Sequence, residues 1–197
     1  MKKTKFLKLI SLLAFGLVFN LNMNAQDQVS GETLVVGNEN GNNPKKTTRL
    51  TVTVGEFYSL NLSSDNALIL LDDESKFAMG SKSTPITMSV FSSRKYSVSA
   101  QVNSAIFNDV AEGTTVNTDN INLLVTKTSG NVEAKITNRE NKSLKHISAE
   151  DIVSSNKATK EDIYSLVYEI PEQNTAAFLD QYGKTISTQI TYTLLPL

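Results

Sequence analysis

Apolar and polar side chains alternate one by one along most of the chain after residue 46. Such a period of two places one set of side chains on each face of an extended strand. In residues 95–102, Tyr96, Val98 and Ala100 share one face, and serines occupy the positions between them. We predict strands of this kind over residues 48–54, 58–62, 85–91, 95–102, 121–127, 132–136, 164–170 and 186–194.

Each predicted strand has one apolar face and one face of Ser, Thr or Lys, the pattern of a sheet that is solvated on one side. The pattern favours an all-β fold: two antiparallel sheets packed face to face in an immunoglobulin-like or Greek-key β-sandwich. We expect the row Tyr96/Val98 to meet the row Tyr192/Leu194 in an interior between the two sheets. Residues 129–131 (Ser-Gly-Asn) are predicted to join strands 121–127 and 132–136 as a hairpin.

Signals for helix are short and lie between the predicted strands. Residues 148–151 and 159–162 match the capping pattern of a helix start, and residues 174–179 suit another short turn. None of them has the length of an amphipathic helix. We therefore expect one or two short helical turns in the loops of the sandwich.

The first 25 residues have the three parts of a secretory signal peptide. Lysines open the segment, an apolar run covers residues 9–19, and a short polar tail ends at Ala25. The run is shorter than the roughly 20 apolar residues that span a bilayer, which predicts cleavage after Ala25 and no membrane span afterwards. We expect an exported protein, and the periplasm, the cell surface and the medium all stay open as destinations.

Cleavage leaves 172 residues, a length that suits one domain. We expect a flexible N-terminal segment over residues 26–46, with an edge-strand candidate at residues 34–36, and a single β-sandwich domain over residues 47–197. The mature chain keeps 15 basic and 20 acidic residues, a net charge of −5, and its basic residues are scattered. We therefore expect no nucleic-acid partner. The absence of cysteine excludes disulfides and a lipid-modified cysteine.

Candidate catalytic and metal-binding residues are few. His146 is the only histidine and lies in a lysine-rich stretch, so we expect it on the surface. Asp72, Asp73 and Glu74 form an acidic cluster that offers oxygen ligands for calcium. The alternative, which we favour, is a charged turn after a buried strand over residues 67–71. We assign no catalytic, cofactor or metal-binding residue.

A secreted hydrolase that uses two carboxylates is a further alternative. Four glutamates on or beside the predicted strands are its candidates: Glu56, Glu112, Glu133 and Glu169. The chain has no tryptophan, and most of its six tyrosines fall on apolar strand faces. Core packing is therefore a better interpretation of the tyrosines than the lining of a sugar-binding groove, and we expect no enzyme.

Two segments carry a resemblance to a known family. Residues 94–100 (Arg-Lys-Tyr-Ser-Val-Ser-Ala) precede the strand at residues 121–125, and residues 186–196 end in Tyr-Thr-Leu-Leu-Pro. This layout resembles the bacterial WxL cell-surface domains, and more distantly pilin-like secreted sandwiches, over the last two-thirds of the mature chain. Tyr96-Ser97-Val98 and Tyr192-Thr193-Leu194 stand for the two Trp-x-Leu motifs, with Tyr in place of each Trp and Ile186 in place of an aromatic residue. The resemblance implies non-covalent attachment to the cell envelope through peptidoglycan.

These observations favour an exported, non-catalytic binding or structural module of the cell envelope, whose partner is an envelope glycan or a surface protein. The alternative is an adhesin-like or pilin-like subunit that assembles by donating a strand, with residues 26–36 or 186–194 as the donor. The oligomeric state and the strand order stay open at this stage.

Overall fold

The computed structural model describes residues 46–137, 142–144 and 146–197. The predicted signal peptide and the edge-strand candidate at residues 34–36 lie outside the described residues. The chain divides into two compact units, Met1–Thr51 and Val52–Leu197. The described part of the first unit, residues 46–51, is exposed and forms no helix or strand, whereas the second unit holds all the described helices and strands.

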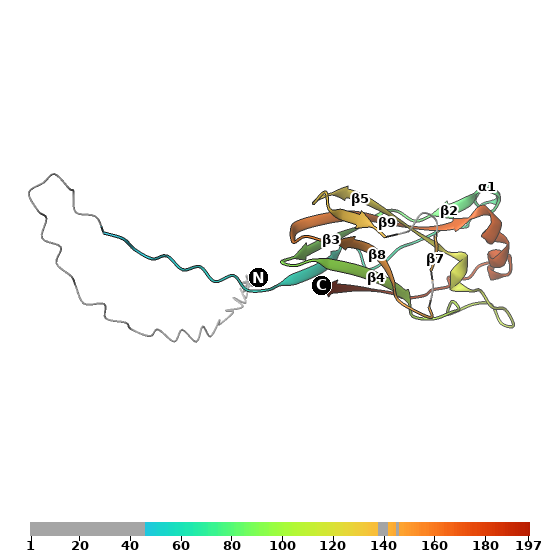
Figure 1. Ribbon diagram of the computed structural model, residues 1–197. Helices are drawn as coiled ribbons and strands as arrows, with labels where there is room; N and C mark the ends of the chain where they lie inside the picture. Colours follow the sequence, from blue (N-terminus) through green and yellow to red (C-terminus); the bar gives the residue numbers. More distant parts are fainter. Residues whose placement is uncertain (1–45, 138–141, 145) are drawn as a thin grey trace, which may run out of the picture. The chain divides into compact units, whose positions relative to one another are not determined.

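Two antiparallel sheets make up the second unit and confirm the predicted all-β sandwich (Figure 1). The larger sheet has the order β1-β3-β9-β5-β7, and β2 also pairs with β9. The smaller sheet has the order β10-β4-β8-β6. The strands are β1 (Tyr58–Leu62), β2 (Gly80–Lys82), β3 (Ile86–Ser92), β4 (Tyr96–Val102), β5 (Asn122–Ser129), β6 (Ala134–Ile136), β7 (Lys142–Ser143), β8 (Glu150–Ser155), β9 (Thr159–Pro171) and β10 (Ile190–Pro196).

The described helices are short and lie in the connections, as predicted. They are α1 (Glu74–Met79), η1 (Thr118–Asn120) and η2 (Glu172–Gln181), and η2 contains the predicted turn at residues 174–179. Within the described ranges, none of them combines the length and the apolar character that a bilayer crossing requires.

The core lies between the sheets and consists of the apolar rows that the alternation predicts. Met88 and Val90 on β3, Val98 on β4 and Leu166 on β9 are almost completely buried. Ser97 and Ser99, on the opposite face of β4, are buried as well, which corrects the expectation that this face is solvated. Strand β4 is an inner strand with β10 on one side and β8 on the other, so its small serine side chains have neighbours on both sides.

Two of the predicted strands are absent because their segments find no strand to pair with. Residues 48–54 keep their alternation but form no strand, and their side chains are exposed. Residues 67–71 are not the buried strand that we expected before the acidic cluster. There Ile69 packs against the core, whereas Leu68 and Leu70 are exposed.

Two predicted helix starts are strands instead. Residues 148–151 run into β8, and residues 159–162 begin β9. The capping pattern is a local preference, and long-range pairing of β8 with β4 and of β9 with β3 overrides it.

Two expected spatial relations are also wrong. Strands β5 and β6 belong to different sheets, so residues 129–131 cross from one sheet to the other and do not form a hairpin. The rows Tyr96/Val98 and Tyr192/Leu194 do not face each other, because β4 and β10 are neighbours in one sheet, with Val98 opposite Leu194. Both rows do contribute to the space between the sheets.

Candidate functional site

A cluster of tyrosines and one aspartate links the two sheets through the core. The Tyr96 hydroxyl on β4 donates to the Asp162 carboxylate on β9 (2.6 Å) and lies 2.9 Å from the Tyr164 hydroxyl. The backbone N–H of Asn131 also donates to Asp162. All three side chains of the cluster are fully buried. Such a cluster satisfies the polar groups that burial would otherwise leave without partners.

The tyrosines of this interior hold their protons tightly. Burial raises the pKa of Tyr96 far above its ordinary range and the pKa of Tyr164 to about 12. Burial also raises the pKa of Tyr168, whose hydroxyl lies 2.6 Å from that of Tyr192 on the other sheet. These hydroxyls therefore remain neutral at physiological pH and act as hydrogen-bonded links between the sheets.

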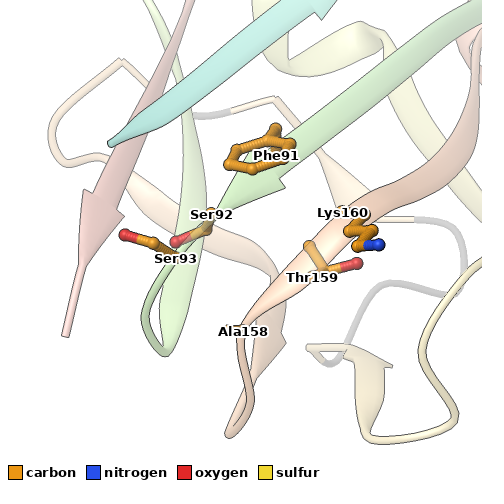
Figure 2. Close-up of a pocket in the computed structure, with 6 residues that line it drawn as sticks. All are labelled: Phe91, Ser92, Ser93, Ala158, Thr159 and Lys160. Atoms are coloured by element: carbon orange, nitrogen blue, oxygen red, sulfur yellow. The ribbon is translucent and has the colours of Figure 1, made fainter. Parts of the chain in front are cut away.

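A shallow depression of about 190 Å³ lies at one end of the sandwich (Figure 2). Its lining comes from the ends of β3 and β9, at the place where the register of that pair shifts between Val90 and Ser92. The hydroxyls of Ser92 and Thr159 are engaged in local bonds to the backbone. Lys160 is its only charged side chain, so this depression offers no set of groups for acid–base chemistry.

The acidic cluster is the start of helix α1. Asp73 is the N-cap, and its carboxylate accepts hydrogen bonds from the Lys76 N–H (3.0 Å) and the Ser75 hydroxyl. These hydrogen bonds lower the pKa of Asp73. Lys76 also forms an ion pair with Asp72. The charged-turn interpretation thus accounts for Asp73 through helix capping and for Asp72 through its ion pair with Lys76.

The other candidate residues are dispersed over the structure. His146 is exposed, as expected. Three of the four candidate glutamates form separate ion pairs, Glu56 with Arg94, Glu133 with Lys157 and Glu169 with Lys82. Glu112 is exposed. Within the described part of the chain, no three acidic or histidine side chains gather as a metal site would require.

One incompletely covered part of the described core lies where the two sheets meet at β1 and β10. Each of these strands is at the edge of its sheet, and the two approach each other. Their inward side chains are only half-buried although they pack against the core. We call these five side chains the edge seam: Leu60, Leu62, Ile190, Tyr192 and Leu194. An incompletely covered apolar strip beside sheet edges is a typical surface for a partner.

The alternation of residues 58–62 and 186–194 predicts that these side chains point inward, but not that they remain partly exposed. Their exposure depends on which strands end up at the edges, and this is decided by pairing between distant segments. The Tyr96–Asp162 link was also missed, because Asp162 lay in a predicted helix start.

Comparison with known proteins gave no match to a family model, to a curated protein or to a solved structure.

Proposed function

We propose that the protein is an exported, non-catalytic structural module of the cell envelope that works by contact with a surface protein. The observation that carries this proposal is the edge seam, where leucine side chains of β1 and β10 remain half-buried at the open side of the sandwich. Its apolar character suits a protein partner better than a glycan, because sugars are held mainly by polar groups and stacked aromatic rings.

Two features of the sequence support the export part of the proposal. The first is the N-terminal segment with the three parts of a signal peptide. The second is the resemblance to WxL domains, whose two motif segments correspond here to β4 and β10. Strands β4 and β10 are hydrogen-bonded neighbours, so one of the two segments contributes directly to the edge seam.

Fractionation of native cells tests the location. We expect the protein in the envelope or the medium, with an N-terminus at Gln26 in mass spectrometry. Recovery of the uncleaved chain from the cytoplasm would contradict the proposal.

Pull-down experiments test the partner class. Variants Leu60→Ser and Leu194→Ser are expected to lose an envelope protein that the wild type retains after cross-linking on intact cells. Thr193→Ser, on the exposed face of β10, is the matched control and should retain it. Binding to purified peptidoglycan that both seam variants leave unchanged would favour the glycan instead.

A further inference from the structure

Residues 48–54 have the alternation of a strand, but no described strand pairs with them. Leu50, Val52 and Val54 lie 86%, 74% and 79% exposed, respectively. They alternate with Thr51 and Thr53, so an extended backbone puts the three apolar side chains on one face. A row of exposed β-branched and apolar residues of this kind is what a sheet edge can bury.

The edge of β10 provides a matching acceptor. The Gln189 carbonyl accepts from the Asn103 N–H, and the Leu197 N–H donates to the Lys95 carbonyl. Since backbone groups alternate in direction along an antiparallel strand, those of Ile190 and Leu194 point away from β4. No described strand pairs with β10 on that outer side.

Donor and acceptor also agree in length and in apolar pattern. Strand β10 has seven residues, and so has the segment 48–54. At about 3.3 Å per residue, each spans roughly 23 Å. A strand added to this edge with Leu50, Val52 and Val54 turned inward would cover the half-buried side chains of the edge seam.

We propose that residues 48–54 of one copy add as a strand to the outer edge of β10 in a second copy. This inference rests on the proposed function and names its partner as another copy of this chain. Every copy carries one donor and one acceptor at different places, so the contact is heterologous and can continue from copy to copy.

The anchoring of the residues that follow the donor favours addition to β10 of a second copy over addition to β10 of the same chain. Phe57 stacks on Phe91 with ring centroids 4.7 Å apart and exchanges hydrogen bonds with Ser93. Glu56 is paired with Arg94 (3.2 Å). A return of residues 48–54 onto the same sandwich needs a turn of at least two residues, and Gly55 is the single residue between this segment and the anchored Glu56 and Phe57.

Site-specific disulfides test the contact directly, because the chain has no cysteine of its own. Thr53→Cys protein is mixed with Thr193→Cys or Thr191→Cys protein under mild oxidation. Thr191 and Thr193 lie on the exposed face of β10, and Thr53 would lie on the same face of the added strand. A disulfide requires Cα atoms within about 7 Å of each other. We expect a mixed dimer whose proteolytic fragments join residue 53 to β10. Lys135→Cys on β6, at the opposite edge of the same sheet, is the control acceptor and should give none.

Equal cross-linking to Lys135→Cys, or no mixed dimer with either β10 variant, would overturn the proposal. So would a double variant, Thr53→Cys with Thr193→Cys, that forms only an internal disulfide in a monomer, because the donor would then fill its own edge.

Light scattering supplies a second readout. The wild type should form species larger than one chain as its concentration rises, and the combined Leu50→Ser, Val52→Ser and Val54→Ser variant should lose them. Thr51→Ser with Thr53→Ser changes the opposite face and should assemble like the wild type. A wild type that stays monomeric to millimolar concentration contradicts the exchange. If the protein fractionates with the cytoplasm but still cross-links through β10, the strand exchange stands and only the proposed envelope function is rejected.

Discussion

Tyr96 and Tyr164 meet in the middle of the sandwich, one from each sheet, and their hydroxyls lie 2.9 Å apart. Tyr168 and Tyr192 form a second such bond at 2.6 Å. Apolar side chains alone would hold the sheets together without fixing how one sheet sits over the other, because hydrophobic burial is not directional. Buried hydrogen bonds are directional, and these two pairs fix the alignment of β9 with β4 and β10.

The raised tyrosine pKa values predict that the protein loses stability in alkali. An unfolded tyrosine releases its proton near pH 10, whereas the folded Tyr164 does so only near 12. The native state therefore binds more protons above pH 10, and the free energy of unfolding falls as the pH rises further, while it is fully retained below pH 10. For Tyr164 we expect a loss of about 1 kcal/mol between pH 10 and 11, measured by urea unfolding, and Tyr96 and Tyr168 should contribute in the same direction. Tyr164→Phe should reduce this loss, and an equal loss in the variant would contradict the assignment.

Gly130 is required beside the buried carboxylate. Its φ is +114°, and a Cβ added there would lie 2.1 Å from an oxygen of Asp162. Gly113 also has positive φ, +75°, but nothing lies within 4 Å of its added Cβ. We therefore expect Gly113→Ala to cost about 1 kcal/mol through backbone strain alone. Gly130→Ala should cost about 3 kcal/mol or more, because a steric clash is added to the strain. Equal losses in urea unfolding would show that the Asp162 contact is unimportant.

At the scale of single elements, alternation predicted the strands that have neighbours. β1 coincides with residues 58–62, and β3, β4 and β5 differ from their predicted spans by a few residues at the ends. Residues 48–54 alternate just as clearly and form no strand, because alternation describes faces and a strand also requires a partner for its backbone. Which segments become partners depends on contacts between residues far apart in sequence, such as Val98 with Leu194.

The same distinction explains what could be predicted of the candidate site. The inward direction of Leu60 and Leu194 follows from local alternation. Their partial exposure does not, since it arises from the strand order, which places β1 and β10 at edges. The Tyr96–Asp162 bond joins residues 66 positions apart and was hidden further by a capping pattern at residues 159–162.

Strand β8 replaces a predicted helical turn, and a pair of neighbouring substitutions tests it. Ile152 is fully buried in β8, whereas Asp151 is exposed. We expect Ile152→Ala to cost about 2–5 kcal/mol because it leaves a cavity between the sheets. Asp151→Ala should stay within about 0.5 kcal/mol. Both values come from urea unfolding, and a loss below about 1 kcal/mol for Ile152→Ala would mean that residues 150–155 do not contribute a core strand.

At the scale of the whole molecule, the proposed exchange joins the partly covered edge of β10 with the strand-like segment 48–54. A sandwich with a half-covered edge is less stable than one whose apolar seam is filled, since each buried leucine or valine contributes about 1.5–3 kcal/mol relative to an exposed one. Strand exchange between copies would therefore make the stability of the protein depend on its concentration.

A synthetic peptide with the sequence of residues 46–55 provides a test of this dependence without assembly. Added to the variant whose Leu50, Val52 and Val54 are serines, the peptide meets an outer edge of β10 with which no described strand pairs, and the altered segment of the variant competes only weakly for it. At a concentration about 100-fold above its Kd, it should stabilise the fold by about 2.7 kcal/mol. This corresponds to a rise in Tm of roughly 5–10 °C for a domain of this size, measured by thermal unfolding. A peptide of the same composition in which the apolar residues are adjacent, and no longer alternate, should give a smaller rise, because it cannot turn all three toward the seam. Equal rises in Tm with both peptides would point to non-specific apolar contact. No rise with either peptide would contradict the addition of residues 48–54 to the edge of β10.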